Sequence, residues 1–215
     1  MHAEAEPRWR RRPAERPEEI LQAALEVFAD QGLAGARVED IAARAGVCKG
    51  TLYRYFPSKD ELFQEAVRSR VEKIVAKLAI AAAPGEPAER LDRFITAWWG
   101  ILRLPLFGKL YRLVLAELHQ FPELVRFYAE EVSGQVSAVA ADIIRQGVEK
   151  RVFRPVDPTV TALMLGALLT QHAVWSGQRE LFSSVGGRSE EELVRDVRNF
   201  VFAAILIDGS RGGES

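Results

Sequence analysis

The chain has 215 residues, 48% of them hydrophobic and 27% charged, with a formal net charge of −1 at pH 7. This length and apolar content suffice for one large or two small folded domains. The balanced charge excludes a protein that is basic over its whole surface, and the single cysteine, Cys48, excludes an intramolecular disulfide.

The sequence predicts a cytoplasmic protein that does not span a membrane. Its longest apolar run, residues 162–169, is far shorter than the roughly 20 residues that a transmembrane helix needs. The N-terminal stretch is basic, but the apolar segment of a secretory signal does not follow it. A lone cysteine is also typical of a reducing compartment.

Residues 1–16 form a polar arm that is rich in arginine and broken by proline. Polar chain ends of this kind are commonly disordered, and we expect the same here. The glycine-rich tail at residues 209–215 is also expected to be disordered. The folded part is therefore predicted to cover residues 17–208.

The first predicted helix covers residues 18–31. Apolar residues recur along it at i, i+3, i+4, i+7 and i+8, a spacing that places them on one face. Two glutamates at its start suit the helix dipole, and Gly32 is expected to end it. The apolar face consists of Ile20, Ala23, Ala24, Val27 and Phe28.

Residues 38–56 predict two short helices joined by a three-residue turn. The first, residues 38–45, has one apolar face, and Gly46 directly after it can adopt the left-handed conformation that ends a helix. The second, residues 48–56, buries Leu52 and Phe56, which lie one turn apart. We expect the helix at residues 18–31 to pack behind this pair. The apolar face of the first short helix consists of Val38, Ile41, Ala42 and Ala45.

The other face of the second short helix combines a small residue, a hydroxyl, basic groups and two phenols. Lysines, hydroxyls and a helix N-terminus can hold phosphates, while arginine, threonine and tyrosine can reach base edges in the DNA major groove. The plain alternative is an amphipathic surface hairpin with a solvated polar face. The helix lengths, the three-residue turn and the exposed aromatics favour a DNA-binding helix-turn-helix. The residues of this face are Lys49, Gly50, Thr51, Tyr53, Arg54 and Tyr55.

The run DIAARAGVCKGTLYRYFPSKDEL, residues 40–62, resembles the helix-turn-helix of the TetR family of bacterial transcriptional repressors. That motif typically ends in K-G-T-L-Y-x-Y-F-x-x-K, and the likeness extends back through residues 20–32. At two places the chain departs from the pattern, because Cys48 and the pair at residues 36–37 stand where the family usually has hydroxyl residues. The resemblance implies that Arg37, Cys48 and Lys59 join the six exposed residues in binding double-stranded DNA.

A DNA-binding head gives two other features a second interpretation. The arginine-rich arm can reach into the adjacent minor groove, as N-terminal arms do in some helix-turn-helix proteins, and it can order only on DNA. The thiolate of Cys48 is favoured by the helix N-terminus and by Lys49, so that oxidation there would weaken DNA binding. The simpler interpretation of Cys48 is a small replacement for serine without a redox role.

The rest of the chain predicts six longer helices and no strand. The first, residues 58–83, starts at a capping box of Ser58 and Glu61 and runs on from the head into the body. The later helices are predicted at residues 88–104, 106–119, 123–152, 158–175 and 189–205, with a loop at residues 178–188. The predicted fold class is all-α. It has a three-helix helix-turn-helix head at residues 17–62 and a ligand-binding and dimerisation bundle of about six helices at residues 63–208.

The body has no catalytic or metal-binding pattern. Its two histidines, His119 and His172, lie far apart in the sequence, and no cysteine or paired acid accompanies them at metal-ligand spacing. No glycine-rich phosphate loop or Ser–His–Asp pattern stands out. We therefore expect no enzyme activity, no cofactor and no metal.

Aromatic residues are spread over four of the body helices, and we expect most of them to belong to the core. The TetR resemblance implies a cavity among them for a small-molecule effector, with a few polar groups that orient it. We expect an apolar or amphipathic effector. The candidate lining residues are Trp98, Leu102, Tyr111, Leu115, Met164 and His172.

Residues 161–170 are apolar all round the predicted helix, which is typical of a helix that is buried on every side, either within one chain or against a partner. Helix-turn-helix proteins commonly read palindromes as two-fold dimers. The resemblance implies that the last two long helices join two chains. We expect the centre of this homodimer near residues 164–170 and 199–205.

Together these features predict a TetR-type transcriptional regulator. We expect a repressor that binds a palindromic operator as a homodimer and is released by its effector. A different class of function stays open, namely a small-molecule carrier or an enzyme with a vestigial DNA-binding head. An activator, or a regulator that takes no ligand, is a third interpretation of the same scaffold.

Overall fold

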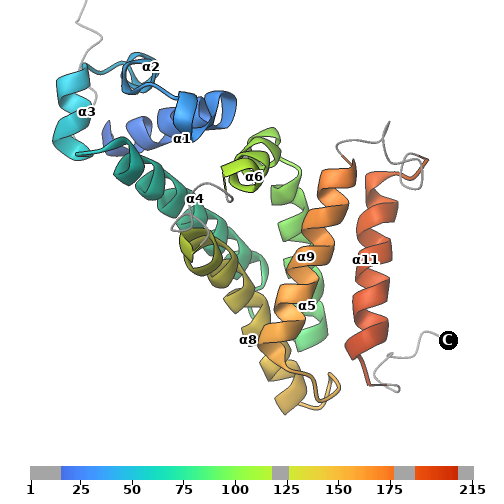
Figure 1. Cartoon of the computed structure of the whole chain (residues 1–215). Helices are drawn as coiled ribbons and strands as arrows, with labels where there is room; N and C mark the ends of the chain where they lie inside the picture. The colour runs from blue at the N-terminus through green and yellow to red at the C-terminus, as the bar shows by residue number, and fades with distance from the viewer. Residues whose placement is uncertain (1–15, 118–125, 177–186, 208–215) are drawn as a thin grey trace, which may run out of the picture. The chain divides into compact units, whose positions relative to one another are not determined.

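A computed structural model describes residues 16–117, 126–176 and 187–207 of the chain (Figure 1). Over these residues it contains nine α-helices and one π-helical segment. It contains no strand there, apart from an isolated bridge between Phe153 and Leu206. The predicted all-α class is therefore confirmed.

The chain divides into two compact units, residues 1–69 and residues 70–215. The boundary between them lies inside one helix, which belongs to both units. Three predicted segments lie outside the described residues, wholly or in part. They are the tail at residues 209–215, the N-terminal arm except for its last residue, and most of the loop before the last helix.

The first unit contains three helices and the start of a fourth. They are α1 (Arg16–Gly35), α2 (Val38–Ala45), α3 (Lys49–Tyr55) and α4 (Lys59–Ala81). The first of them is longer than predicted, because the chain stays helical to Gly35 after an interruption at Gly32, where φ is 78°. By contrast, α3 is one residue shorter at each end, since Cys48 and Phe56 are extended and flank it as caps.

The core of the first unit lies between α1, α2, α3 and the first turns of α4. The rings of Phe28 and Phe63 meet edge to face there, with centroids 5.2 Å apart. Only Leu52 of α3 is buried in this core, so the remaining surface of this helix faces outward. The fully buried side chains of the unit include Ile20, Phe28, Ile41, Leu52, Leu62 and Phe63.

The second unit is a helical bundle. Its elements after α4 are α5 (Pro87–Leu102), α6 (Pro105–Glu117), the π-helical segment η1 (Tyr128–Gly134), α8 (Gln135–Glu149), α9 (Pro158–Ser176) and α11 (Glu190–Ile205). Helices α5, α8 and α9 pack against one another, and α11 covers α5 and α9 (Figure 1). The predicted capping box starts α11: Glu192 N donates to Ser189 Oγ, and Ser189 N donates to Glu192 Oε2.

The single α-helix predicted for residues 123–152 is wrong in two respects. The described part of this stretch contains a π-helical segment, Tyr128–Gly134, before α8 begins. A Cβ atom at position 134 would lie only 3.1 Å from Ala129 O. Glycine, which has no Cβ, therefore suits this position in the widened π-helical turn. The helix also ends at Glu149, well before the proline that was expected to stop it.

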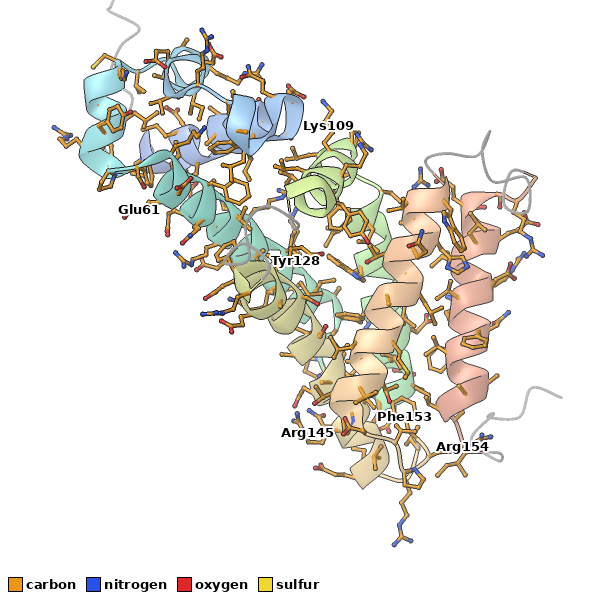
Figure 2. The ribbon with its side chains drawn as sticks, viewed as in Figure 1. Glu61, Lys109, Tyr128, Arg145, Phe153 and Arg154 are labelled. Carbon is orange, nitrogen blue, oxygen red and sulfur yellow. The ribbon has the colours of Figure 1, made fainter. Side chains whose placement is uncertain are left out.

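The end of α8 is fixed by Phe153, whose ring folds back onto the helix. Arg151 has a left-handed φ of 58°, and the N–H groups of Val152 and Phe153 both donate to Gly147 O, at 2.9 and 3.0 Å. The ring of Phe153 thereby lies directly on Gly147 and is fully buried. Beyond it, Arg154 N donates to Ile205 O at 2.7 Å, which brings this loop to the end of α11 (Figure 2).

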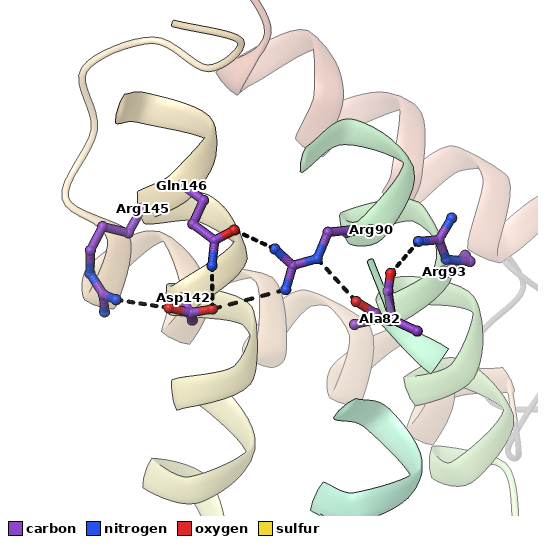
Figure 3. A network of polar contacts seen from close by, with 7 residues as sticks. Ala82, Arg90, Arg93, Asp142, Arg145 and Gln146 are labelled. Atoms are coloured by element: carbon purple, nitrogen blue, oxygen red, sulfur yellow. Dashed lines mark hydrogen bonds and ion pairs between the residues drawn. The ribbon is translucent and has the colours of Figure 1, made fainter. Parts of the chain in front are cut away.

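Two arginines of α5 cap the carbonyl end of α4 (Figure 3). Arg90 Nε donates to Ala82 O at 3.0 Å, and Arg93 donates to Ala81 O at 3.0 Å and to Ala83 O at 2.6 Å. The last carbonyls of a helix have no partner within the helix, so these bonds satisfy groups that would otherwise need water. The cap ties the last turn of α4 to α5.

Arg90 also connects this cap to α8. Its Nη1 donates to Gln146 Oε1 at 2.5 Å, and its Nη2 lies 3.9 Å from Asp142 Oδ2. Gln146 in turn donates to Asp142 at 2.7 Å, and Arg145 donates to the other oxygen of that carboxylate at 3.0 Å. The end of α4 is thus held in one polar network with α5 and α8.

Replacing Gly147 by alanine tests the contact that ends α8. The added Cβ would overlap the Phe153 ring, so Gly147→Ala should lower the free energy of unfolding by about 1–3 kcal/mol. The matched control is Gly100→Ala in α5, where an added Cβ meets nothing within 4 Å. This control should raise stability by about 0.5–1 kcal/mol, because alanine favours a helix interior over glycine. Urea denaturation followed by circular dichroism measures both. Equal midpoints for the two variants would contradict the packing described.

Candidate functional site

The connection between α2 and α3 is a tight three-residue turn. Gly46, with φ 66° and ψ 33°, is left-handed and closes α2, and Val47 N donates to Ala42 O at 3.0 Å. Cys48 is extended, and its carbonyl oxygen accepts the first helical hydrogen bonds, from Thr51 N and Leu52 N. Two short helices are therefore set at a fixed angle, with the polar side of α3 outward.

The outward surface of α3 holds the six residues that the sequence predicted. Lys49, Gly50 and Arg54 are exposed, Tyr53 is 41% exposed, and Thr51 and Tyr55 are half-buried at its sides. Gly50 has open space around its Cα, so a DNA backbone or base could come close at that point. This is a compact surface of cations, phenols and one hydroxyl on a single helix.

The cations of α3 are held in place by their neighbours. Lys49 Nζ donates to Glu39 Oε1 at 2.5 Å and lies 5.7 Å from the centre of the Tyr53 ring. The hydrogen bond from Lys49 lowers the pKa of the Glu39 carboxyl, and the same bond raises the pKa of Lys49. The Arg54 guanidinium lies over the Tyr55 ring, 5.2 Å from its centre. Both basic groups are therefore ordered over aromatic rings on the outward face.

The thiol of Cys48 contacts a different partner from the one predicted. Its Sγ lies 3.0 Å from Thr51 Oγ1, and the hydrogen bond with this hydroxyl is the main cause that lowers the pKa of Cys48. Backbone N–H groups of Thr51 and Gly50 lower it further, as expected at the start of a helix. The ammonium group of Lys49, which was expected to favour the thiolate, donates instead to Glu39.

The two remaining predicted DNA-binding residues differ in their surroundings. Arg37 is exposed directly before α2 and makes no side-chain cap there. Lys59 instead points inward, and its Nζ donates to Ala34 O and Ala36 O, both at 3.3 Å. Lys59 therefore ties the start of α4 to the connection between α1 and α2. Sequence reasoning missed this supporting contact, because it joins residues far apart in the chain.

Two cavities lie side by side in the second unit. The cationic cavity, of about 310 Å³, is lined by the start of α6 and the ends of α5 and α9. The aromatic cavity, of about 280 Å³, is lined by α5, α6, η1, α8 and α9. Phe107 and Tyr111 line both of them. The aromatic cavity is completed by Trp98, Tyr128, Val132, Ser133, Val136, Ser137, Leu163, Gly166, Ala167, Thr170 and Gln171.

Three of the predicted ligand-binding residues lie at these cavities. Trp98 lines the aromatic cavity, Leu102 lines the cationic one, and Tyr111 lines both. Met164 and His172 line neither: Met164 is 62% exposed on the outer side of α9, and His172 Nδ1 is 2.8 Å from Leu168 O. We therefore leave both out of the site. The side chain of Leu115 lies outside the described part of the chain.

The walls of the aromatic cavity combine stacked rings with polar groups. Trp98 meets Phe107 edge to face at 5.8 Å, and Phe107 stacks on Tyr111 at 6.1 Å. The Nε1 of Trp98 is buried and has no hydrogen-bond partner among the described residues. Burial, with a smaller contribution from Tyr111, raises the pKa of Tyr128 to about 12. Tyr128 is therefore a neutral phenol at physiological pH.

An exposed apolar surface covers one side of α9 and α11. On α9 it includes Val160 and Leu163, each 46% exposed, and the more exposed Met164. On α11 it includes Phe200, which is 65% exposed, beside the exposed Ala203 and Ala204. Part of the helix at residues 161–170 is therefore uncovered in a single chain. Its burial on every side, expected either within one chain or against a partner, stays a prediction that requires a partner.

The comparisons with known proteins agree with this geometry. The profile of bacterial regulatory proteins of the tetR family matches residues 20–66, and that of the C-terminal domain of AefR-like transcriptional repressors matches residues 89–204. The chain belongs to the TetR family. Its first unit is the family's DNA-binding helix-turn-helix, and the protein is a transcriptional regulator.

Individual helix-turn-helix transcriptional regulators are similar over most of the chain. The repressor KstR2 of Mycobacterium tuberculosis (strain ATCC 25618 / H37Rv) is 31% identical over 140 residues, or 64% of this chain and 68% of that protein. The regulator RutR of Escherichia coli (strain K12) is 28% identical over 196 residues, or 89% of each chain. A solved TetR-family regulator from Mesorhizobium loti MAFF303099 superposes with a TM-score of 0.73 at 26% identity, covering 92% of this chain and 100% of that one.

The described residues hold no cluster of three or more His, Cys, Asp or Glu side chains that is suited to a metal ion. Among the described helices, none combines the length and the hydropathy that crossing a membrane requires.

The pKa of Tyr128 gives a test of its burial. Because its pKa in the folded chain is raised to about 12, the neutral phenol contributes stability below about pH 10, the pKa of a free tyrosine, and this contribution is lost as the pH rises through 12. Tyrosinate absorbance should therefore show a late step that disappears in Tyr128→Phe and persists in Tyr53→Phe, a control that removes an exposed phenol. If the late step is lost in Tyr53→Phe and not in Tyr128→Phe, while circular dichroism shows that both chains are folded, the burial of Tyr128 is contradicted.

Proposed function

We propose that this TetR-family regulator is a repressor that binds a palindromic operator as a homodimer and is released by an apolar or amphipathic small molecule. The observation that carries the proposal is the outward surface of α3. There Lys49, Tyr53, Arg54 and Tyr55 project from a helix whose opposite side is anchored by Leu52.

The chemistry of this surface suits DNA. Lys49 and the N-terminal turn of α3 are placed to hold phosphates, while Arg54, Thr51 and Tyr53 can reach base edges. On binding, Lys49 would exchange the carboxylate of Glu39 for a phosphate, which keeps its charge paired throughout. The arginine-rich arm at residues 1–16 and Arg37 would add contacts beside the groove.

Dimerisation is supported by the exposed apolar surface of α9 and α11. Met164 and Phe200 are large apolar side chains that a single chain leaves uncovered. Large apolar side chains exposed in this way commonly mark a protein interface. A two-fold pair through these helices would present two copies of α3 to successive major grooves.

Release by an effector is supported by the polar cap on α4. The aromatic cavity is lined by α5 and α8, the same helices that hold the end of α4. Arg90 and Arg93 of α5 bond to that end directly, and Gln146 of α8 accepts a hydrogen bond from Arg90. A ligand that spreads these helices would therefore move the last turn of α4, which is continuous with its first turns in the DNA-binding unit. Effector and operator would oppose each other by roughly 1–3 kcal/mol, the usual size of allosteric coupling.

Selection of binding sites from random duplex DNA tests the proposal. The purified wild-type chain should enrich one palindrome, and Lys49→Ala combined with Tyr53→Ala should weaken binding to it by roughly tenfold to a hundredfold, because phosphate and base contacts are lost together. The control Lys77→Ala, which removes an exposed cation of α4 outside the helix-turn-helix, should keep wild-type affinity. No enriched sequence, with binding that vanishes as salt is raised, would instead favour a carrier or an enzyme with a vestigial head.

Light scattering across a concentration series tests the dimer. Met164→Glu combined with Phe200→Glu should raise the dissociation constant by at least about a hundredfold, because two unpaired carboxylates would be buried. Both side chains are exposed in one chain, so the monomer should stay folded. The matched control Ile80→Glu places the same charge on an exposed apolar position of α4 and should remain dimeric. A wild type that is monomeric at every concentration would refute the pairing.

A further inference from the structure

The charges around the two cavities are sharply divided. Among the described residues, the lining of the cationic cavity includes Arg103, Lys109 and Arg112 and no acidic residue. Arg103 forms an ion pair with Glu190 outside that lining. Arg112 has no acidic partner among the described residues. Two exposed basic residues of α6, Lys109 and Arg112, line this cavity.

The aromatic cavity has the opposite character. It is lined by rings, aliphatic side chains, three hydroxyl residues and one glutamine, and no lining residue is charged. A charged group placed there would lose its hydration without gaining a counter-charge. A planar or aliphatic group would instead be covered by Trp98, Phe107 and Tyr111, and could use the hydroxyls for orientation.

The stacked rings of Phe107 and Tyr111 form part of the wall of both cavities. Their planes are 13° from parallel, and both rings line both cavities. A ligand that lies along this stack would have one end among the side chains of the aromatic cavity. Its other end would lie within the field of Lys109 and Arg112, and arginine forms strong charge-assisted hydrogen bonds to carboxylate, sulfonate or phosphate oxygens.

We propose that the effector is an amphipathic organic anion. Its apolar body occupies the aromatic cavity, and its anionic group lies at the cationic cavity against Lys109 and Arg112. This inference rests on the proposed function for the role of the ligand, and it adds the ligand's chemical class and the residues that select it.

Two fluorescent probes with the same ring system separate the apolar from the anionic contribution. One is 1-anilinonaphthalene-8-sulfonate, and the other is N-phenyl-1-naphthylamine, which lacks the sulfonate. The full-length wild type should bind one sulfonate probe per chain, at least about tenfold more tightly than the neutral probe, because only the former has a charge-assisted contact. Energy transfer from tryptophan to the probe, reduced in Trp98→Phe, would place it in the aromatic cavity.

Matched variants then assign the contacts. Lys109→Gln combined with Arg112→Gln should weaken the sulfonate probe by about tenfold and leave the neutral probe unchanged. The control Lys77→Gln combined with Lys150→Gln removes the same number of charges from exposed positions of the second unit outside both cavities, and should change neither affinity. Gly166→Leu should weaken both probes, since a Cβ there meets nothing within 4 Å and the longer side chain fills the aromatic cavity.

The proposal is overturned if the neutral probe binds as tightly as the sulfonate, or if the α6 double variant loses no more affinity than its control. Binding-site selection is run on the same preparations. If the probes show an anion preference but no palindrome is enriched, the ligand site is supported and its role in regulation is refuted. If a palindrome is enriched but the probes show no anion preference, the proposed repressor function is supported and only the anionic class of the effector is refuted.

Discussion

The second unit depends on how the carbonyl end of α4 is satisfied. A helix leaves its last carbonyls without internal partners, and a long helix can fray there. Arg90 and Arg93 take up three of these carbonyls, and Arg90 also reaches Gln146 on α8. A guanidinium is permanently charged and has a rigid set of donors, and its positive charge complements the helix C-terminus. Displacements of α5 and α8 are therefore passed to α4 through directed bonds, and fraying of its last turn does not absorb them.

The DNA-binding surface has a comparable constraint. A seven-residue helix such as α3 would not be stable alone, so its geometry is imposed from outside. The left-handed Gly46 sets its direction, Leu52 anchors it in the core, and Lys59 holds the start of α4 against the connection before α2. Because these supports lie on its inner side, the outward side is left for polar residues. The pairing of Lys49 with Glu39 then keeps a cation ordered there before any phosphate is present.

Features that depend on local rules could be predicted from the sequence. The bounds of α2, the left-handed Gly46 and the capping box at Ser189 follow from residue types a few positions apart. Features that depend on distant contacts could not. The inward contact of Lys59, the π-helical turn at Tyr128 and the fold-back of Phe153 onto Gly147 each require knowledge of what lies opposite. For the same reason only part of the cavity lining could be predicted. The sequence pattern of an aromatic residue is the same whether its side chain fills a core or lines a cavity.

Helix α9 shows how one apolar sequence can serve three surroundings at once. Successive residues point about 100° apart around a helix, so neighbours in sequence face different partners. Leu165 is buried in the core, Gly166 lines the aromatic cavity, and Met164 lies on the outer face. Three apolar surroundings explain why the sequence of this helix is apolar all round. They also explain why the sequence pattern predicts Met164 in the cavity lining, although its side chain lies on the outer face. This arrangement also has a consequence for regulation. Under the proposed function, the wall that would touch a bound ligand and the surface that would meet a second chain are sides of one helix, so a rotation of α9 would change both together.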